Sequence, residues 1–138
     1  MTTYVLALEK DLFFAVKIRD TLRHYDIEAK TVRNLPAFEE ALTAKDEQKY
    51  ALVIVNTATV GVDWEAAIRQ ARQAGLNVLA FGSHLDLEAR SKALEAGAQR
   101  VVANSKFSSD MPGLVERMLN ESAASSFKET TSESEGAI

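Results

Sequence analysis

The stretch that decides the fold is ALVIVNTATVGVDW, residues 51–64. Its first five residues are apolar on both faces of an extended chain, which is typical of a strand buried in a parallel sheet. A more polar loop follows, and Asp63 then precedes the helical pattern WEAAIRQARQA. A buried strand, a loop and an amphipathic helix in this order predict one β-α unit of an α/β domain.

The same kind of unit recurs along the chain on both sides of this stretch. Three more apolar runs are typical of buried strands, and one polar run is typical of an edge strand. The buried runs are YVLAL (4–8), NVLAF (77–81) and RVVA (100–103), and the edge run is EAKTVR (28–33). A segment with helical spacing follows each run, so the sequence predicts five β-α units.

The helices are predicted from their end signals and from the spacing of their apolar residues. Asp11 is expected to cap the first helix, whose apolar face would hold Phe14, Ile18, Leu22 and Tyr25. The other end signals are Pro36 in a first turn, Asp63 and Asp86 as caps, and Gly75 and Gly97 as terminating residues. The last helix is predicted from Ser109 to Leu119.

Five strands that alternate with five helices predict an α/β fold with a five-stranded parallel sheet, doubly wound so that helices cover both faces. Ligands of such folds bind at the carboxyl ends of the strands. The candidate functional residues therefore follow the strands, in segments 9–11, 56–62, 82–84 and 104–107.

Composition divides the chain into one domain and a tail. The chain has 138 residues, and single domains cluster near roughly 100–150 residues. It has no cysteine, which excludes disulfides and thiolate chemistry. Residues 1–120 are expected to form the domain. Residues 121–138 are rich in Ser, Thr and Glu, and we expect them to be disordered.

Charge, hydropathy and motifs exclude several function classes. The net charge of −4 is concentrated in the acidic tail, so the domain lacks the basic surface that binds nucleic acid. No apolar run approaches the roughly 20 residues of a membrane span, and no secretory signal is present. We therefore expect a cytoplasmic protein without membrane contact. Nucleotide-binding and hydrolase motifs are missing as well, so we expect no enzymatic activity, no cofactor and no metal.

Four segments carry a resemblance to a known family. They are VLALEKD (5–11), ALVIVNTATVGVDW (51–64), NVLAFGS (77–83) and ALEAGAQRVVANSKF (93–107). In this order they resemble the acidic first strand, the phosphoacceptor strand, the hydroxyl-bearing fourth strand and the lysine-bearing last strand of the response-regulator receiver (CheY-like) domain. The resemblance covers about residues 3–120. It implies the strand order 2-1-3-4-5 and a place in two-component signalling, where receivers take part in a phosphorelay.

The sequence departs from the family at the residues that would carry the chemistry. The phosphoacceptor aspartate matches Asn56, whose amide cannot act as the carboxylate nucleophile. The two adjacent acids that hold Mg²⁺ match Glu9 and Lys10, and an ammonium group repels this cation. The hydroxyl that follows the phosphoryl group matches Gly82, and the lysine that pairs with the phosphate matches Asn104.

These departures imply a pseudo-receiver that is not phosphorylated. It is expected to act as a protein–protein interaction module for a signalling or regulatory protein, or for a second copy of itself. The resemblance assigns the contact to the face built from residues 86–119. One alternative is a sensor of a flavin-type or nucleotide-type ligand in the crevice at the strand ends. Another is an atypical receiver that is phosphorylated elsewhere, at Ser83 or Asp63.

Residues at the start of the first helix are further candidates for a pocket or a contact surface. Lys10 either replaces the metal beside Glu9 and Asp11, or points to solvent while Asp11 merely caps the helix. Phe13 and Phe14 are adjacent, so they cannot both face the core. One of the two phenylalanines is therefore expected to be exposed near the pocket mouth.

Five residues of the later loops complete the candidate set. Trp64 lies beside the phosphoacceptor loop, where it would cover the pocket, fill it or anchor a partner. His84 follows Ser83 after the fourth strand and is either a ligand-binding group or a solvated loop residue. Lys106 would reach the site if the last strand were shifted in register. The aromatic switch residue of the family matches Val101.

Overall fold

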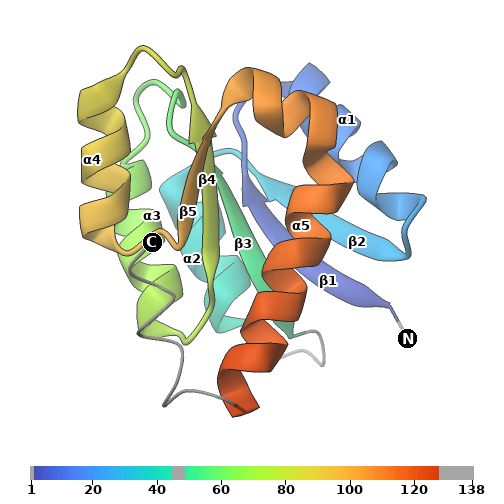
Figure 1. Cartoon of the computed structure of the whole chain (residues 1–138). Coiled ribbons are helices and arrows are strands. Elements are labelled where there is room, and N and C mark those ends of the chain that lie inside the picture. The colour runs from blue at the N-terminus through green and yellow to red at the C-terminus, as the bar shows by residue number, and fades with distance from the viewer. Residues whose placement is uncertain (1, 45–48, 128–138) are drawn as a thin grey trace.

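Five strands and five helices alternate along the chain (Figure 1). The structure is a computed structural model that describes residues 2–44 and 49–127, with side chains described as far as residue 121. The strands are β1 (Thr3–Leu8), β2 (Ile27–Val32), β3 (Tyr50–Asn56), β4 (Val78–Gly82) and β5 (Arg100–Ala103). The helices are α1 (Leu12–Arg23), α2 (Leu35–Thr43), α3 (Trp64–Gln73), α4 (Leu87–Ala96) and α5 (Asn104–Phe127).

The strands form one parallel sheet in the order β2-β1-β3-β4-β5. This arrangement confirms the predicted five-stranded, doubly wound fold. The register places Leu8 beside Val55 and Asn56 beside Phe81. The carboxyl ends of β1, β3 and β4 therefore lie level with one another, which brings the segments that follow them to one edge of the sheet.

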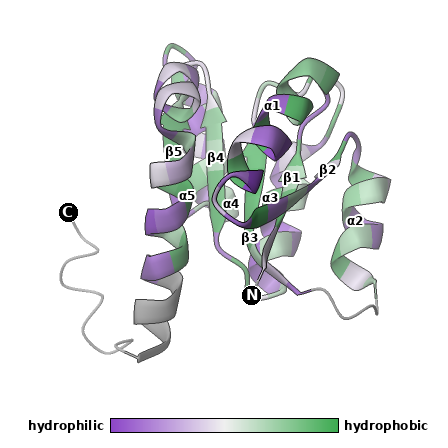
Figure 2. Cartoon of the chain, turned by 90° about the vertical axis from the view of Figure 1, so that its right-hand side faces the viewer, coloured by the Kyte–Doolittle hydropathy of each residue, from purple (hydrophilic) through white to green (hydrophobic). Residues whose placement is uncertain are grey.

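Helices cover both faces of the sheet, with α1 and α5 on one face and α2, α3 and α4 on the other (Figure 1). Successive residues of a strand point to opposite faces, so each central strand contributes to two cores. Ile54 of β3 packs with α1 and α5, whereas its neighbours Val53 and Val55 pack with α2, α3 and α4. This double burial explains the unbroken apolar runs of the three central strands β1, β3 and β4, which contribute to the green parts of the sheet in Figure 2.

Three aromatic rings organise the core beneath α1 and α5. Phe81 and Phe107 stack with their ring centroids 4.0 Å apart, and Phe14 meets them edge-on at 5.5 and 6.1 Å. The side chain of Phe13 is 81% exposed. The prediction that Phe13 and Phe14 cannot share the core is confirmed, because a helix turns about 100° between adjacent residues.

The predicted helix ends are confirmed where a side chain or a glycine specifies them. The carboxylates of Asp11, Asp63 and Asp86 accept hydrogen bonds from backbone N–H groups in the first turns of α1, α3 and α4. Gly97 ends α4 with a φ of 120°, a conformation that favours glycine. A Cβ atom at Gly97 would also lie 2.6 Å from Cγ of Arg72.

The prediction that Tyr25 belongs to the apolar face of the first helix is wrong. The helix ends at Arg23, and Tyr25 lies beyond it with 49% of its surface exposed. The chain turns there instead of continuing as a helix, because the N–H groups of Tyr25 and Asp26 return to Leu22 and Arg23. Asp26 takes a positive φ of 61° before β2 begins.

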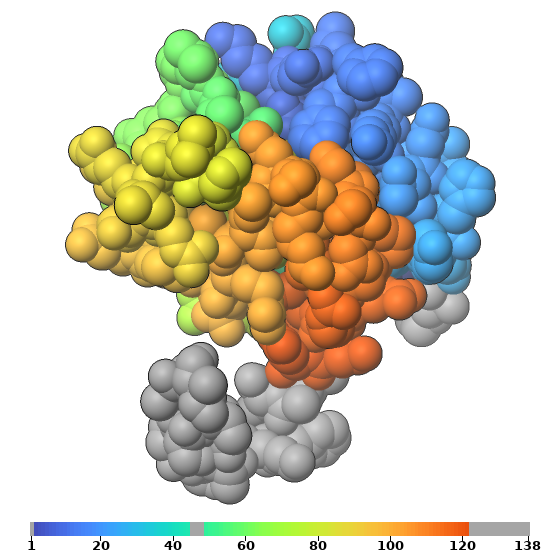
Figure 3. All heavy atoms as spheres, turned by 45° about the horizontal axis from the view of Figure 1, so that its top comes forward, coloured from blue at the N-terminus to red at the C-terminus, as the bar shows by residue number. Residues whose placement is uncertain are grey.

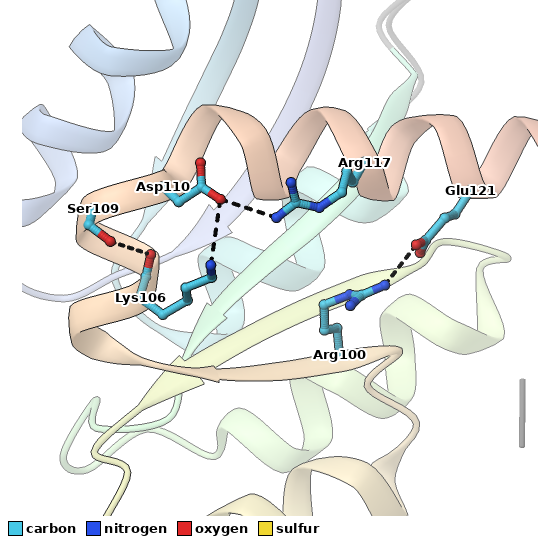
Figure 4. A network of polar contacts seen from close by, with 6 residues as sticks. All are labelled: Arg100, Lys106, Ser109, Asp110, Arg117 and Glu121. Atoms are coloured by element: carbon cyan, nitrogen blue, oxygen red, sulfur yellow. Dashed lines mark hydrogen bonds and ion pairs between the residues drawn. The ribbon is translucent and has the colours of Figure 1, made fainter. Parts of the chain in front are cut away.

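The last helix also differs from its prediction, since α5 follows β5 without a loop and begins at Asn104. Phe107 and Met111 are buried four residues apart, and this spacing holds the first turns on the sheet. The helix kinks at Asp110, two residues before Pro112. There Asp110 accepts a hydrogen bond from Arg117 at 3.1 Å and forms an ion pair with Lys106 at 3.8 Å (Figure 4).

The expected domain boundary at residue 120 falls within α5, whose backbone continues to Phe127. An ion pair of 2.7 Å between Arg100 of β5 and Glu121 of α5 joins the helix to the sheet at this point (Figure 4). The remainder of the expected disordered tail, residues 128–138, lies outside the described residues.

Replacing Phe81 by Ala tests the aromatic core. We expect the free energy of unfolding to fall by about 3–5 kcal/mol, because the substitution removes a fully buried ring and leaves a cavity against Phe14 and Phe107. Urea denaturation measures this change. The matched control is Phe13→Ala, expected to change the same free energy by less than about 0.5 kcal/mol. Equal losses in both variants would contradict this placement of the rings.

Candidate functional site

The candidate site lies at the carboxyl-terminal edge of the sheet (Figure 3). The start of α1 (blue), the segment after β3 (green), the segment after β4 (yellow) and the first turns of α5 (orange) surround this edge in the space-filling view. Most of the residues singled out in the sequence lie in these segments. The fold therefore brings the candidates from distant parts of the chain to one side of the molecule.

A carboxylate and an amide meet at the centre of this edge. Glu9 directly follows β1 and is 1% exposed, and one of its oxygens, Oε1, accepts a hydrogen bond of 2.8 Å from Nδ2 of Asn56. Its other oxygen, Oε2, accepts from the backbone N–H of Asp11 at 3.1 Å. The Oδ1 atom of Asn56 accepts from the N–H of Ala58 at 2.8 Å, which fixes the amide with its N–H groups toward Glu9.

Burial raises the pKa of Glu9 above the ordinary value of a glutamate side chain. The hydrogen bond from Asn56 and the backbone N–H groups of Asp11 and Lys10 act in the opposite direction, because they stabilise the carboxylate. The folded chain holds the Glu9 proton more tightly than the unfolded chain does. The contribution of this group to the free energy of unfolding is therefore largest at low pH and falls as the pH rises through the raised pKa.

Lys10 links two loops and does not take the place of a metal ion. Its Nζ atom donates to the carbonyl oxygen of Val60 at 3.0 Å, and its own carbonyl oxygen accepts from Nε of Arg33 at 3.1 Å. Among the described residues no ion pair joins Lys10 to Glu9 or Asp11. Of the two interpretations of this residue, the structure supports the exposed lysine beside a capping aspartate.

Thr57 lies in the candidate segment 56–62, but the sequence analysis gave it no role of its own. It follows Asn56, and its hydroxyl donates to the carbonyl oxygen of Phe81 at 3.3 Å. A Cβ atom at Gly82 would clash with Oγ1 of Thr57, so the threonine occupies the space that a side chain at position 82 requires. The pairing of β3 with β4 creates this relation, which the two separated sequence segments do not reveal.

The residues that follow β5 do not take part in the hydrogen-bonded network around Glu9. Asn104 is exposed as the first residue of α5. Lys106 lies in the first turns of the same helix, where its ammonium group pairs with Asp110 (Figure 4). A lysine held in this way does not supply a cation to the Glu9–Asn56 pair.

The donor set does not fit a magnesium ion. Mg²⁺ takes six oxygen ligands in tight octahedral geometry, usually with carboxylates among them. Both carboxylate oxygens of Glu9 accept hydrogen bonds, and Asn56 points its N–H groups toward Glu9. The carboxylate of Asp11 caps α1. No cluster of three or more acidic or histidine side chains suited to a metal occurs in the part of the chain that the structure describes.

A cavity of about 260 Å³ lies beside this network, between α4 and β5. We call it the α4–β5 cavity. Its lining consists of the strand ends and the first turns of α4, namely Thr57, Gly82, Ser83, His84, Asp86, Leu87, Arg90, Val101, Val102 and Ala103. Trp64 does not line it. The indole is half-buried and packs against the core on the side of α2, α3 and α4.

Several large apolar side chains in the segments at this edge are exposed. Leu12 and Phe13 follow β1, Val60 follows β3, and Leu85 and Leu87 follow β4. Each is at least 60% exposed. We call these five residues the strand-end rim. They come from the segments that follow β1, β3 and β4.

Replacing Asn56 by Asp tests the buried pair. The substitution places a second carboxylate against Glu9 where an amide now donates, and we expect the free energy of unfolding to fall by about 1–3 kcal/mol near neutral pH. The loss should shrink at about pH 5, because the two carboxyl groups then share a proton. Urea denaturation at both pH values measures the effect. Asn104→Asp, at an exposed position, is the matched control, and equal stability of the two variants near neutral pH would contradict the proposed pairing.

Comparisons with known proteins identify the fold. No protein-family model matches the sequence, and a search of curated proteins finds no match. In the described part of the chain, no helix has the length and apolar character needed to cross a membrane.

Solved receiver domains are similar over nearly their whole length. A CheY-like response regulator receiver domain protein from Methanospirillum hungatei JF-1 matches with a TM-score of 0.75 and 14% identity, over 90% of this chain and 98% of its own. A response regulator receiver protein from Burkholderia phymatum matches with a TM-score of 0.75 and 23% identity, over 86% and 96%. A structure described as adenylate cyclase from Rhodopirellula baltica matches with a TM-score of 0.74 and 18% identity, over 96% and 98%. The chain has the fold of a response-regulator receiver domain.

Proposed function

We propose that this chain is a pseudo-receiver, a regulatory module of signalling that binds a protein partner and takes no part in phosphotransfer. The observation that carries this proposal is the hydrogen bond of 2.8 Å from Asn56 to Glu9. Asn56 occupies the position at which the resemblance expects a phosphoacceptor aspartate.

The chemistry of Asn56 supports this proposal. Formation of an acyl phosphate needs a carboxylate nucleophile, and a carboxamide has no comparable anionic oxygen. The Oδ1 atom of Asn56 is moreover engaged by the N–H of Ala58, while its nitrogen faces Glu9. Both ends of the side chain therefore serve the local fold.

The hydrogen bond from Asn56 also removes the need for a divalent cation beside the Glu9 carboxylate. Two adjacent carboxylates repel each other unless a cation or a proton lies between them. An amide donor opposite Glu9 satisfies the same buried carboxylate without added charge. The fold of the loops is thus compatible with a permanently metal-free state.

The strand-end rim supports a role in binding a protein. Apolar side chains that are exposed together, rather than singly, are typical of contact surfaces. Phe13 and Val60 are 81% and 80% exposed. By contrast, much of the charge along α5 is paired within the chain, as in the Asp110–Arg117 contact. The rim, which shares only Leu87 with the face built from residues 86–119, is therefore our first choice for the contact.

The alternatives receive less support from the geometry. At about 260 Å³ the α4–β5 cavity lies below the range of roughly 300–1,000 Å³ typical of sites for drug-sized ligands, which disfavours a flavin or a dinucleotide. Asp63 caps α3 through Ala66, and Oγ of Ser83 accepts from the N–H of Leu85. Neither residue is placed as a substitute phosphoacceptor beside Glu9.

Titration with Mg²⁺ tests the loss of phosphoryl chemistry. We expect the wild-type chain to show no heat of Mg²⁺ binding in calorimetry and no mass gain after exposure to an acyl phosphate. The Lys10→Asp/Asn56→Asp double variant is expected to bind Mg²⁺, because it removes one ammonium group and adds two carboxylates in the segments that hold Glu9. Lys17→Asp/Asn104→Asp makes the same substitutions at exposed positions of α1 and α5 and is the control. Phosphorylation of the wild-type chain would overturn the proposal.

Partner capture tests the rim. A tagged full-length chain is expected to retain specific proteins from extracts of its source cells, and the Leu12→Ser/Phe13→Ser variant is expected to lose them, because it removes exposed apolar surface without disturbing the core. Leu94→Ser, at a 45% exposed position of α4, is the control. Loss of the same proteins with Leu94→Ser alone would move the contact to the face built from residues 86–119.

A further inference from the structure

Small residues from the sheet line one side of the α4–β5 cavity, which we call its base. Gly82 contributes no side chain, and Val101 and Ala103 present short apolar groups from β5. Thr57 forms part of the base and is held by its hydrogen bond to Phe81. The base and one wall therefore offer apolar surface, which favours an apolar portion of a ligand.

The side of the cavity formed by α4 and the segment that precedes it carries hydrogen-bond donors. Arg90 reaches across from α4, and its Nη1 atom donates to the carbonyl oxygen of Val101 at 2.9 Å, which leaves the other guanidinium N–H groups available. Ser83 accepts from the N–H of Leu85, so its own hydroxyl proton is available as well. His84 is exposed in the same wall and adds one ring N–H.

The charges at the cavity restrict the ligand further. Arg90 is a permanent cation, and a guanidinium binds a carboxylate through parallel hydrogen bonds. Asp86 also lines the cavity, and its carboxylate accepts from the N–H of Ala89 at the start of α4. One positive and one negative charge at the same opening favour a ligand with a single negative charge over a phosphate with two.

We propose that the α4–β5 cavity binds a small monocarboxylate with an apolar body, of the size of a single aromatic ring. The carboxylate pairs with Arg90 and accepts from Ser83, and the apolar body lies against Val101 and Ala103. The volume of about 260 Å³ sets the limit on size, since larger cofactors require larger pockets. This site is separate from the Glu9–Asn56 pair and does not depend on the proposed loss of phosphotransfer.

Benzoate is the probe, and benzamide, which has the same shape without the charge, is the matched ligand control. We expect benzoate to shift the backbone amide resonances of residues 82–90 and 100–103 saturably, with a dissociation constant on the order of 1 mM. Benzamide should bind at least about tenfold more weakly, because the charge-assisted hydrogen bonds to Arg90 are lost. Equal affinities for the two probes, shifts confined to other residues or no saturation by about 10 mM benzoate would each overturn the proposal.

Two variants test separately the contribution of the Arg90 charge and that of the shape of the cavity. Arg90→Gln is expected to weaken benzoate binding by about tenfold or more, whereas Arg69→Gln, at an exposed position of α3, should leave it unchanged. Val101→Phe keeps all charges but fills the base, and it should abolish binding. Thermal unfolding of each variant verifies that it folds. Unchanged benzoate affinity in a folded Val101→Phe variant would place the ligand elsewhere and overturn the proposal.

Discussion

Burial of β1, β3 and β4 on both faces is the constraint on which the rest of the structure depends. A strand that is covered on both sides must be apolar along its whole length, so polar chemistry can begin only where the strand ends. Leu8 is buried and Glu9 follows it, and Val55 is buried and Asn56 follows it. Because the register aligns these strand ends, Glu9, which follows β1, meets Asn56 at the end of β3.

At this point the buried Glu9 carboxylate needs a hydrogen-bond partner, and the side-chain amide of Asn56 supplies one. Glu9 is nearly inaccessible to solvent, and an unpaired buried carboxylate would destabilise the fold. Asn56 and the backbone N–H of Asp11 satisfy both of its oxygens within the chain. A carboxylate at position 56 would instead require a cation or a proton. The Glu9–Asn56 hydrogen bond therefore stabilises the loops. The same amide accounts for the loss of phosphotransfer that we propose.

Much of the fold was predictable because its signals are local. Asp11, Asp63 and Asp86 cap the helices for which they were predicted as caps, since capping involves groups within three residues of each other. Prediction from local sequence failed where a contact between distant residues determines where a helix begins. The segment after β5 has a polar sequence, yet burial of Phe107 against Phe81 draws it into α5.

The sequence by itself determined the five β-α units, the parallel sheet and the presence of an amide at position 56, because each follows from apolar periodicity or from the identity of one side chain. The tertiary structure alone decided what those side chains contact. It directed the Lys10 ammonium to Val60 instead of the acidic residues and set Thr57 in the space beside Gly82. It also opened the cavity between α4 and β5. These relations join residues that are distant along the chain, and only the packing of neighbouring strands and loops brings them within contact distance.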